Sequence, residues 1–247
     1  MTPEPTCPAH LATWTLGRDV AEPAWVTVPA VVMDLPRTRR PRALLALWAV
    51  AQLDAAPWID ATTESIGETL TGRSPGPTAL ALADLHAAGL VTPGPRETWT
   101  LTKEPGLTMR MPLWFAGCEL TYAAVAVYGA LTLHAAWRRA IRHGWMPAES
   151  VTKGLAAKAG AAVTGLDPAL RHGDPVPLDL VALAGLAGVT RFRELAAALD
   201  ALQRLNALVV TATPTATLYR LLPRDGERCQ PCDDAHHARH EHPADPI

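Results

Sequence analysis

The chain repeats itself once, at a distance of about eighty residues, and this self-similarity constrains its fold more than any other feature. Residues 45–56 align position by position with residues 125–136, and each segment has one aromatic residue at the same place, Trp48 or Tyr128. Self-similarity at a fixed distance indicates a fold built from similar units. With 247 residues, the chain is long enough for two units of ordinary domain size.

The similarity extends on both sides of these helical segments. Upstream, residues 25–29 and residues 107–112 are predicted to be extended, and each stretch ends in an apolar residue and a proline. Downstream, each copy has a long helix closed by Gly89 or Asn206, the residue types that best tolerate a left-handed turn. A hairpin follows, with strands predicted at residues 90–91 and 98–101 in the first copy and at residues 208–211 and 217–221 in the second.

Between the matched helix and the hairpin, each copy is predicted to have two more helices. In the first copy, Thr62 or Thr63 caps a helix that runs to residue 70, and Ser74 caps the next one. In the second copy, a short helix at residues 178–186 is followed by a tight turn and by a helix capped by Thr190. An additional helix is predicted at residues 146–160. One face of the helix that follows Thr190 is predicted to be buried, formed by Phe192, Leu195, Leu199 and Leu202.

Two short helices joined by a tight turn and followed by a two-stranded wing describe the winged helix-turn-helix. Residues 25–222 resemble the tandem winged-helix proteins of plasmids and mobile elements, which include replication initiators and transcriptional regulators. The resemblance implies a mainly α fold with small β-hairpin wings, of the α+β class. It divides the chain into an N-terminal segment (1–24), a first winged-helix domain (25–106), a second one (107–222) and a flexible Cys/His-rich tail (223–247).

The same resemblance implies a function. We expect sequence-specific binding of double-stranded DNA, as a transcriptional regulator or as a plasmid replication or partition factor. Kleisin-binding subunits of chromosome-organising complexes share the tandem arrangement, so a protein-interaction adaptor with weak or no DNA binding is the alternative. The net charge of -2 favours this alternative, because it provides no overall basic field. The positive charge is concentrated in residues 116–222, which contain ten Arg or Lys against seven Asp or Glu.

The best candidates for base contacts lie where the last helix of the second copy begins. These candidates are Thr190, Arg191 and Arg193. Arg191 and Arg193 are predicted to point away from the buried face, and arginine can make a bidentate contact to guanine. The alternative is that both arginines are solvated on an exposed face.

In the first copy, the corresponding helix starts with Ser74-Pro-Gly-Pro, which offers few donors. Its candidate contacts are Arg73, Ser74 and Thr78, together with Arg96 at the tip of the wing. A cluster of arginines just before the first matched helix is a candidate phosphate-binding arm, because positive charge is unfavourable at a helix N-terminus and needs another explanation. This cluster consists of Arg37, Arg39, Arg40 and Arg42.

The tail contains four residues of the types that bind zinc. A Cys-x-x-Cys pair is followed by two histidines, but the connector between them is too short for a classical finger, and a tail that binds metal only adventitiously is the alternative. These residues are Cys229, Cys232, His236 and His240. Otherwise we expect no cofactor.

The chain contains no recognisable nucleotide-binding, metalloprotease or hydrolase motif, so it is predicted not to be an enzyme. Residues 120–137 lack formal charge but contain Thr121, Gly129, Thr132 and His134, which favours a buried helix over a membrane span. Four cysteines without a framework or a leader sequence favour a reducing, cytoplasmic location. Homodimerisation through the apolar first helices is plausible.

Overall fold

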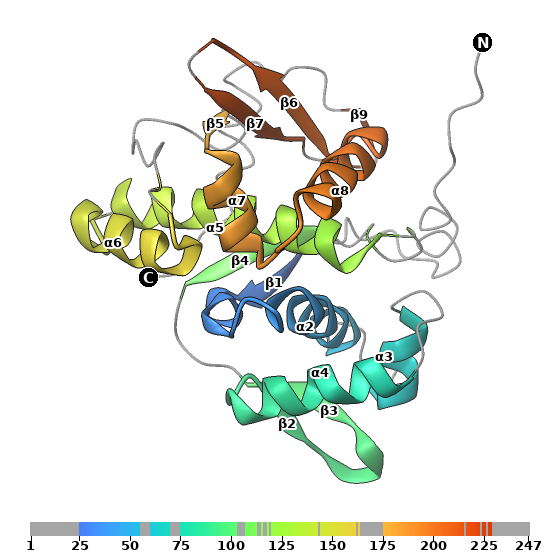
Figure 1. Ribbon diagram of the computed structural model, residues 1–247. Helices are drawn as coiled ribbons and strands as arrows, with labels where there is room; N and C mark the ends of the chain where they lie inside the picture. The colour runs from blue at the N-terminus through green and yellow to red at the C-terminus, as the bar shows by residue number, and fades with distance from the viewer. Residues whose placement is uncertain are drawn as a thin grey trace, which may run out of the picture.

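The computed structural model describes residues 25–54, 60–69, 75–102, 107–112, 115, 118, 120–142, 144–161, 163, 175–214, 216–222, 224–225 and 227–228. Within these residues the protein is mixed α+β, with helices and small antiparallel sheets (Figure 1). We call residues 25–106 the first copy and residues 107–222 the second copy.

The order of elements predicted for each copy is confirmed. The first copy contains β1 (Trp25–Pro29), the 3-10 helix η1 (Ala30–Asp34), α2 (Arg40–Asp54), α3 (Thr63–Thr69), α4 (Pro75–Ala87), β2 (Val91–Pro93), the 3-10 turn η2 (Pro95–Glu97) and β3 (Trp99–Leu101). The second copy contains β4 (Thr108–Pro112), α5 (Tyr122–Arg142), α6 (Ala148–Ala159), β5 (Val176–Pro177), α7 (Leu180–Ala187), α8 (Phe192–Arg204), β6 (Leu208–Ala212) and β7 (Thr217–Leu221). Two short strands follow, β8 (Arg224–Asp225) and β9 (Glu227–Arg228).

Local chemistry explains where several helices begin and end. The Thr62 hydroxyl accepts a hydrogen bond from the Ser65 amide at 3.1 Å and so caps α3. Asp179 caps α7 in the same way, accepting from the Val181 amide at 2.7 Å. Gly89 and Asn206 have φ values of 72° and 52°, so the predicted left-handed residues after α4 and α8 are confirmed.

Each copy folds its hairpin beside a third extended segment. In the second copy, β5 pairs with β7 to give a three-stranded sheet in the order β5-β7-β6. The sequence analysis did not predict strand β5. In the first copy, β2 pairs with β3, and a single bridge between Thr62 and Thr98 takes the position that β5 has in the second copy. The two copies therefore share one arrangement of helices and strands, which is more complete in the second.

Strands β1 and β4 join the copies, and their pairing has two-fold symmetry. Thr27 lies opposite Arg110 at the centre of the antiparallel ribbon, while Trp25 pairs with Pro112 and Pro29 with Thr108. Pro29 and Pro112 are counterparts in the repeat, 83 positions apart, and Thr27 and Arg110 are separated by the same number. Trp25 therefore faces the counterpart of Pro29, while Pro29 faces Thr108, the counterpart of Trp25. This reciprocal pairing is the pattern of an isologous interface.

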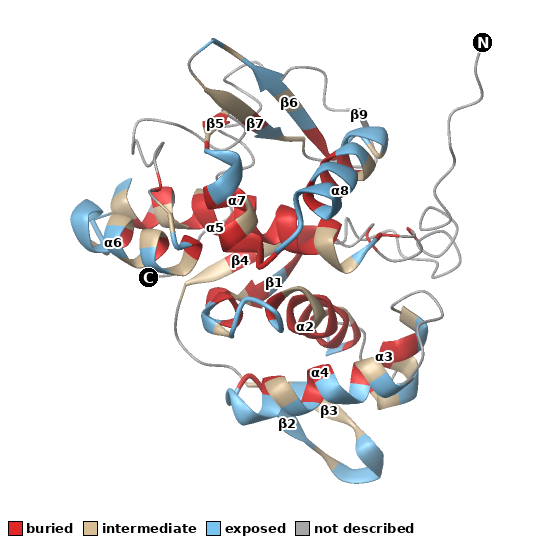
Figure 2. Cartoon of the chain, in the orientation of Figure 1, coloured by how far each residue is buried: buried red, intermediate tan, exposed pale blue. Residues whose placement is uncertain are grey.

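Helices α2 and α5 lie on each side of this ribbon and complete the contact between the copies (Figure 1). A side chain at Gly129 of α5 would collide with Leu44 of α2, so the two helices cross in close contact. The Trp48 indole donates to the Pro112 carbonyl at 3.1 Å inside the core. One hydrophobic core extends from Val26 to Tyr219, and the buried residues are concentrated along α2, α5 and β4 (Figure 2).

This packing bears on two predictions. Residues 124–134 of α5 are buried, so the prediction of a buried helix is confirmed, and no helix among the described residues is long and apolar enough to cross a membrane. The predicted homodimer through the apolar first helices is wrong for α2, because residues 43–51 are buried within the same chain. The apolar surface of these helices holds the two copies of one chain together.

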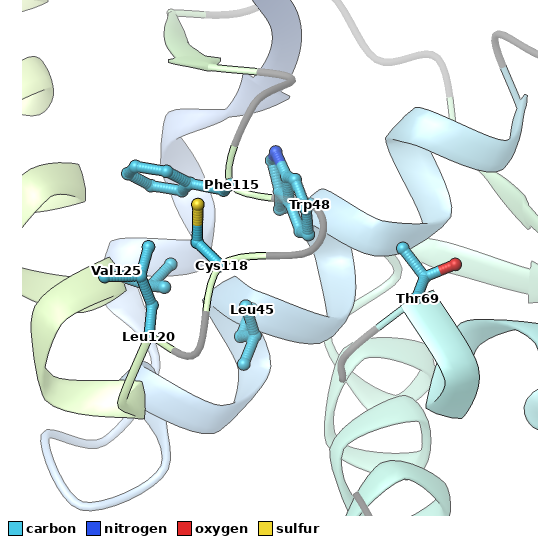
Figure 3. A pocket seen from close by; sticks show the side chains of 7 residues that line it. All are labelled: Leu45, Trp48, Thr69, Phe115, Cys118, Leu120 and Val125. Carbon is cyan, nitrogen blue, oxygen red and sulfur yellow. The ribbon is translucent and has the colours of Figure 1, made fainter. Parts of the chain in front are cut away.

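A small hollow lies where α2, α3 and the start of α5 meet (Figure 3). Among the described residues that line it, the polar side-chain groups are the Thr69 hydroxyl, the Cys118 thiol and the Trp48 indole N–H, and none of them is charged. Its lining consists of Leu45, Trp48, Thr69, Phe115, Cys118, Leu120 and Val125. The Phe115 ring packs against Tyr128 with ring centres 4.9 Å apart, which fills the space between the matched aromatic residues of the repeat.

Candidate nucleic-acid interface

The first turn of α8 presents an exposed surface of mixed chemistry. Thr190, Arg191, Phe192 and Arg193 are all exposed, and so are Ala196 and Ala197 on the next turn. The opposite face of α8 is buried through Leu195, Ala198, Leu199 and Leu202. The predicted division of this helix is therefore confirmed for its leucines and for Arg191 and Arg193. The outer side of α8 is visibly exposed in Figure 2.

Two details of this turn were predicted incorrectly. Thr190 is not the N-cap, because the helix begins at Phe192 and Arg191 occupies the cap position without a side-chain cap. Phe192 is not in the core, since 62% of it is exposed. Phe192 is the first residue of α8, so it lies at the end of the helix, although its spacing of three residues from Leu195 places the two on neighbouring parts of the helix surface.

The arginines of this turn are only lightly neutralised. Arg191 makes one ion pair, 3.4 Å long, with Glu194, and both side chains are largely exposed, so the pair contributes little. Arg193 has no ion-pair partner among the described residues. Both side chains can therefore turn toward an anionic ligand at small cost.

The β6-β7 hairpin adds a basic residue that sequence reasoning missed. Arg220 is exposed on β7 and lies opposite Val209 of β6, while the neighbouring Tyr219 is buried. The alternation of residues 217–221 already indicated that Arg220 points away from the core. At the turn of this hairpin, the Thr213 hydroxyl donates to the Ala216 carbonyl at 2.7 Å.

The corresponding helix of the first copy has a different surface. Gly76, Ala79, Leu80 and Ala83 of α4 are exposed and carry no charge, and 58% of Leu80 is exposed. Thr78, a predicted DNA contact, is only 2% exposed, and its position in the core makes that prediction wrong. The other two predicted contacts of this helix, Arg73 and Ser74, lie outside the described residues.

The predicted arginine arm is largely occupied within the protein. Helix α2 begins at Arg40, so Arg40 and Arg42 belong to its first turns rather than to a segment before it. Arg39 and Arg42 both bind the Asp84 carboxylate of α4, at 2.9 and 2.8 Å. Arg37 is exposed on the surface but lies against Gly160 at the end of α6.

Arg40 is not a candidate phosphate ligand, because it is only 5% exposed. Its guanidinium donates to the Leu35 carbonyl at 3.0 Å and to the Gly185 and Leu186 carbonyls at 2.9 Å each. Burial, together with the nearby charge of Arg37, lowers the pKa of Arg40 to about 10. The group stays protonated at neutral pH and stabilises the C-terminal carbonyls of α7.

Two further sets of predicted residues remain. Arg96 is exposed at the tip of the β2-β3 hairpin, in the left-handed conformation with φ of 56°, so its position at the tip is confirmed. The predicted zinc ligands Cys229, Cys232, His236 and His240 lie outside the described residues. Within the described ranges, no three His, Cys, Asp or Glu side chains come together as a metal site.

Comparison with known proteins gives no match of any kind: no family model, no curated protein and no solved structure is similar to this chain.

Proposed function

We propose that this protein binds double-stranded DNA through two tandem winged-helix domains, and that the second copy makes the main contact. The order helix, helix, turn, helix and hairpin, with β5 completing a three-stranded sheet, supports a winged helix in the second copy. In this fold, α8 is the helix that enters the major groove and the β6-β7 hairpin is the wing.

The observation that carries the proposal is the exposed first turn of α8. Arg191 and Arg193 extend from a helix whose other face is anchored in the core, and the N-terminal residues of a recognition helix are those that contact base edges. The small residues Ala196 and Ala197 follow on the exposed side and leave room for the backbone of the helix to approach DNA. Arg220 on the wing is in a position to contact phosphate.

The two copies are proposed to act unequally. Gly76, Ala79, Leu80 and Ala83 on the exposed face of α4 carry no charge, and the nearby Arg39 and Arg42 are both paired with Asp84. The first copy then orients the second and adds few contacts of its own. A role as transcriptional regulator or as plasmid replication or partition factor agrees with this proposal.

The test is binding to duplex DNA, measured by fluorescence anisotropy at two salt concentrations and followed by selection of sequences from a random pool. We expect steep salt dependence and enrichment of a defined motif. The double variant Arg191→Ala/Arg193→Ala should lose the motif and reduce the salt slope. Lys153→Ala is the matched control, because Lys153 is an exposed helical cation paired with Glu149 on α6; it should bind like the wild type.

A second candidate function is that of a protein-interaction adaptor. Exposed Leu80, on an α4 face without charge, favours it, because an exposed apolar surface suits a protein partner better than it suits a phosphate backbone. Under this alternative, DNA binding at low salt is no stronger than background, and the variant Leu80→Asp removes binding of a partner protein without unfolding the chain.

A further inference from the structure

A single segment of the first copy contacts the ends of two helices in the second copy. This segment, residues 34–40, precedes and begins α2. Asp34 forms an ion pair with Lys158 near the end of α6. Arg37 lies against Gly160, and its carbonyl occupies the space that a side chain at Gly188 would need. The two copies therefore touch where α6 and α7 both end.

Arg40 is the buried member of this set of contacts and makes three hydrogen bonds. The last carbonyls of a helix lack partners within the helix and lie at the negative end of its dipole. Arg40 binds two of them in α7, those of Gly185 and Leu186, from the other copy and out of contact with water. A third bond, to Leu35, holds the guanidinium in place from its own side. A buried charge with such partners fixes the geometry of both segments that it joins.

The contact of residues 34–40 with the ends of α6 and α7 lies immediately before the proposed DNA-contacting turn. Gly188, with φ of 73°, closes α7, and only residues 189–191 separate it from the start of α8. Gly185 of the same segment packs so tightly on the Ala159 carbonyl that a side chain there would collide with it. The direction of α8 is thus set at a place where α6, α7 and the first copy converge.

We propose that Arg40 is a positioning residue for α8, through which the first copy holds the DNA-contacting turn of the second copy in its binding orientation. This inference rests on the proposed function and deepens it. The first copy then contributes to DNA affinity without touching DNA, by keeping the end of α7 ordered before DNA arrives. Without the Arg40 contact, the first turn of α8 is less ordered in the free protein. DNA binding must then order this turn, which lowers the affinity.

Two variants and one control test this role in the full-length chain. Arg40→Gln removes the charge and the planar fork of donors. Arg40→Lys keeps the charge, but its single ammonium cannot reproduce the fork that spans Leu35, Gly185 and Leu186. Arg39→Gln is the matched control, since Arg39 is the preceding residue but bonds to Asp84 within the first copy.

Hydrogen exchange of the backbone amides, thermal unfolding and DNA affinity are measured for each variant. We expect Arg40→Gln to increase exchange at residues 184–194 about tenfold, with the amides of the first copy unchanged, and to weaken DNA binding by about the same factor. Arg40→Lys should restore part of both effects, and Arg39→Gln should leave residues 184–194 and the affinity within about twofold of the wild type.

Three results would overturn the inference. The first is wild-type exchange at residues 184–194 in both Arg40 variants. The second is exchange that rises equally throughout the chain with a large drop in melting temperature, which assigns Arg40 a general role in stability. The third is local exchange that rises while affinity stays constant. If the wild-type protein does not bind DNA at all, the proposed function fails instead, and the exchange data alone still decide whether Arg40 orders the turn.

Discussion

At the scale of single residues, Phe192 is the side chain whose position most needs an explanation. An aromatic ring exposed to 62% between two arginines leaves apolar surface that no element of the described part of the chain covers. In the major groove, the C5-methyl group of thymine is the apolar feature that such a ring can contact. Under the proposed DNA-binding function, we expect Phe192 to be a specificity determinant.

The corresponding prediction uses the DNA as well as the protein. Replacing thymine by deoxyuridine in the selected duplex, one position at a time, should weaken wild-type binding at one position by about 1 kcal/mol, or roughly fivefold. The variant Phe192→Ala should bind both duplexes equally, because the methyl group has lost its contact. Competition by anisotropy measures this double-mutant cycle. Equal losses for both proteins at every position would contradict the contact.

Asp84 carries a second prediction at this scale. Its carboxylate is 14% exposed and accepts from both Arg39 and Arg42, so it joins α4 to α2 through two charge-assisted bonds. Asp84→Asn should lower the free energy of unfolding by about 1–2 kcal/mol, measured by urea denaturation. Glu149→Gln, which breaks an exposed pair with Lys153 one helical turn away, should change it by less than about 0.5 kcal/mol. Similar values for the two variants would show that the Asp84 bonds are as weak as surface pairs.

At the scale of secondary structure elements, periodicity and turn residues predicted the helices and hairpins well. The left-handed positions Gly89 and Asn206 were identified because few residues tolerate that conformation. Arg40 and Arg42 were predicted to precede the helix that begins at Arg40, because Arg40-Pro-Arg carries no apolar signal. Pro41 fits the first turn of a helix and does not interrupt it. Strand β5 was missed because two residues show no alternation.

Tyr219 on β7 provides a prediction at this scale. Burial, with the charge of Asp179 adding to it, raises the pKa of Tyr219 to about 12. An unfolded tyrosine titrates near 10, so between these two values only the unfolded chain loses the proton. The stability that Tyr219 contributes is complete below pH 10 and is lost as the pH rises toward 12.

The measurement compares urea denaturation of the wild type and of Tyr219→Phe. Between about pH 9 and about pH 11, the wild type should lose about 1 kcal/mol more unfolding free energy than the variant, because phenylalanine cannot ionise. The other groups that titrate at alkaline pH are the same in both proteins, so their contributions to the unfolding free energy cancel in this comparison. Parallel losses in the two proteins would mean that the Tyr219 hydroxyl has the same acidity in the folded and unfolded chain.

At the scale of the whole molecule, the repeat predicted two similar units but not how they join. The pairing of β1 with β4 involves residues about eighty positions apart, and nothing in either strand specifies its partner. The contacts of Arg40 are likewise not specified by the residues around it in the sequence. Its buried bonds to Gly185 and Leu186 depend on the arrangement of the copies, so sequence reasoning assigned it to a solvent-exposed arm. The candidate site on α8 was predictable, because it depends on one helix with a regular buried face.

The joined arrangement leads to a prediction about cooperativity. Val28 of β1 and its repeat counterpart Met111 of β4 are both fully buried in the ribbon between the copies, and α2 and α5 pack across the same region. Neither copy retains a covered core without the other, so both should unfold in one transition. Met111→Ala should lower the free energy of unfolding by about 2–5 kcal/mol, and Val28→Ala should lower it by about 2 kcal/mol.

Far-UV circular dichroism and tryptophan fluorescence, followed together through a urea titration, distinguish one transition from two. Coincident curves are expected for the wild type and for both ribbon variants. Val209→Ala, at an exposed position on β6, is the control and should move the midpoint little. A variant of the ribbon that unfolds one copy and leaves the other intact would show that each copy is stable alone. In that case the proposed coupling between the first copy and α8 would depend on the Arg40 contact rather than on a shared core.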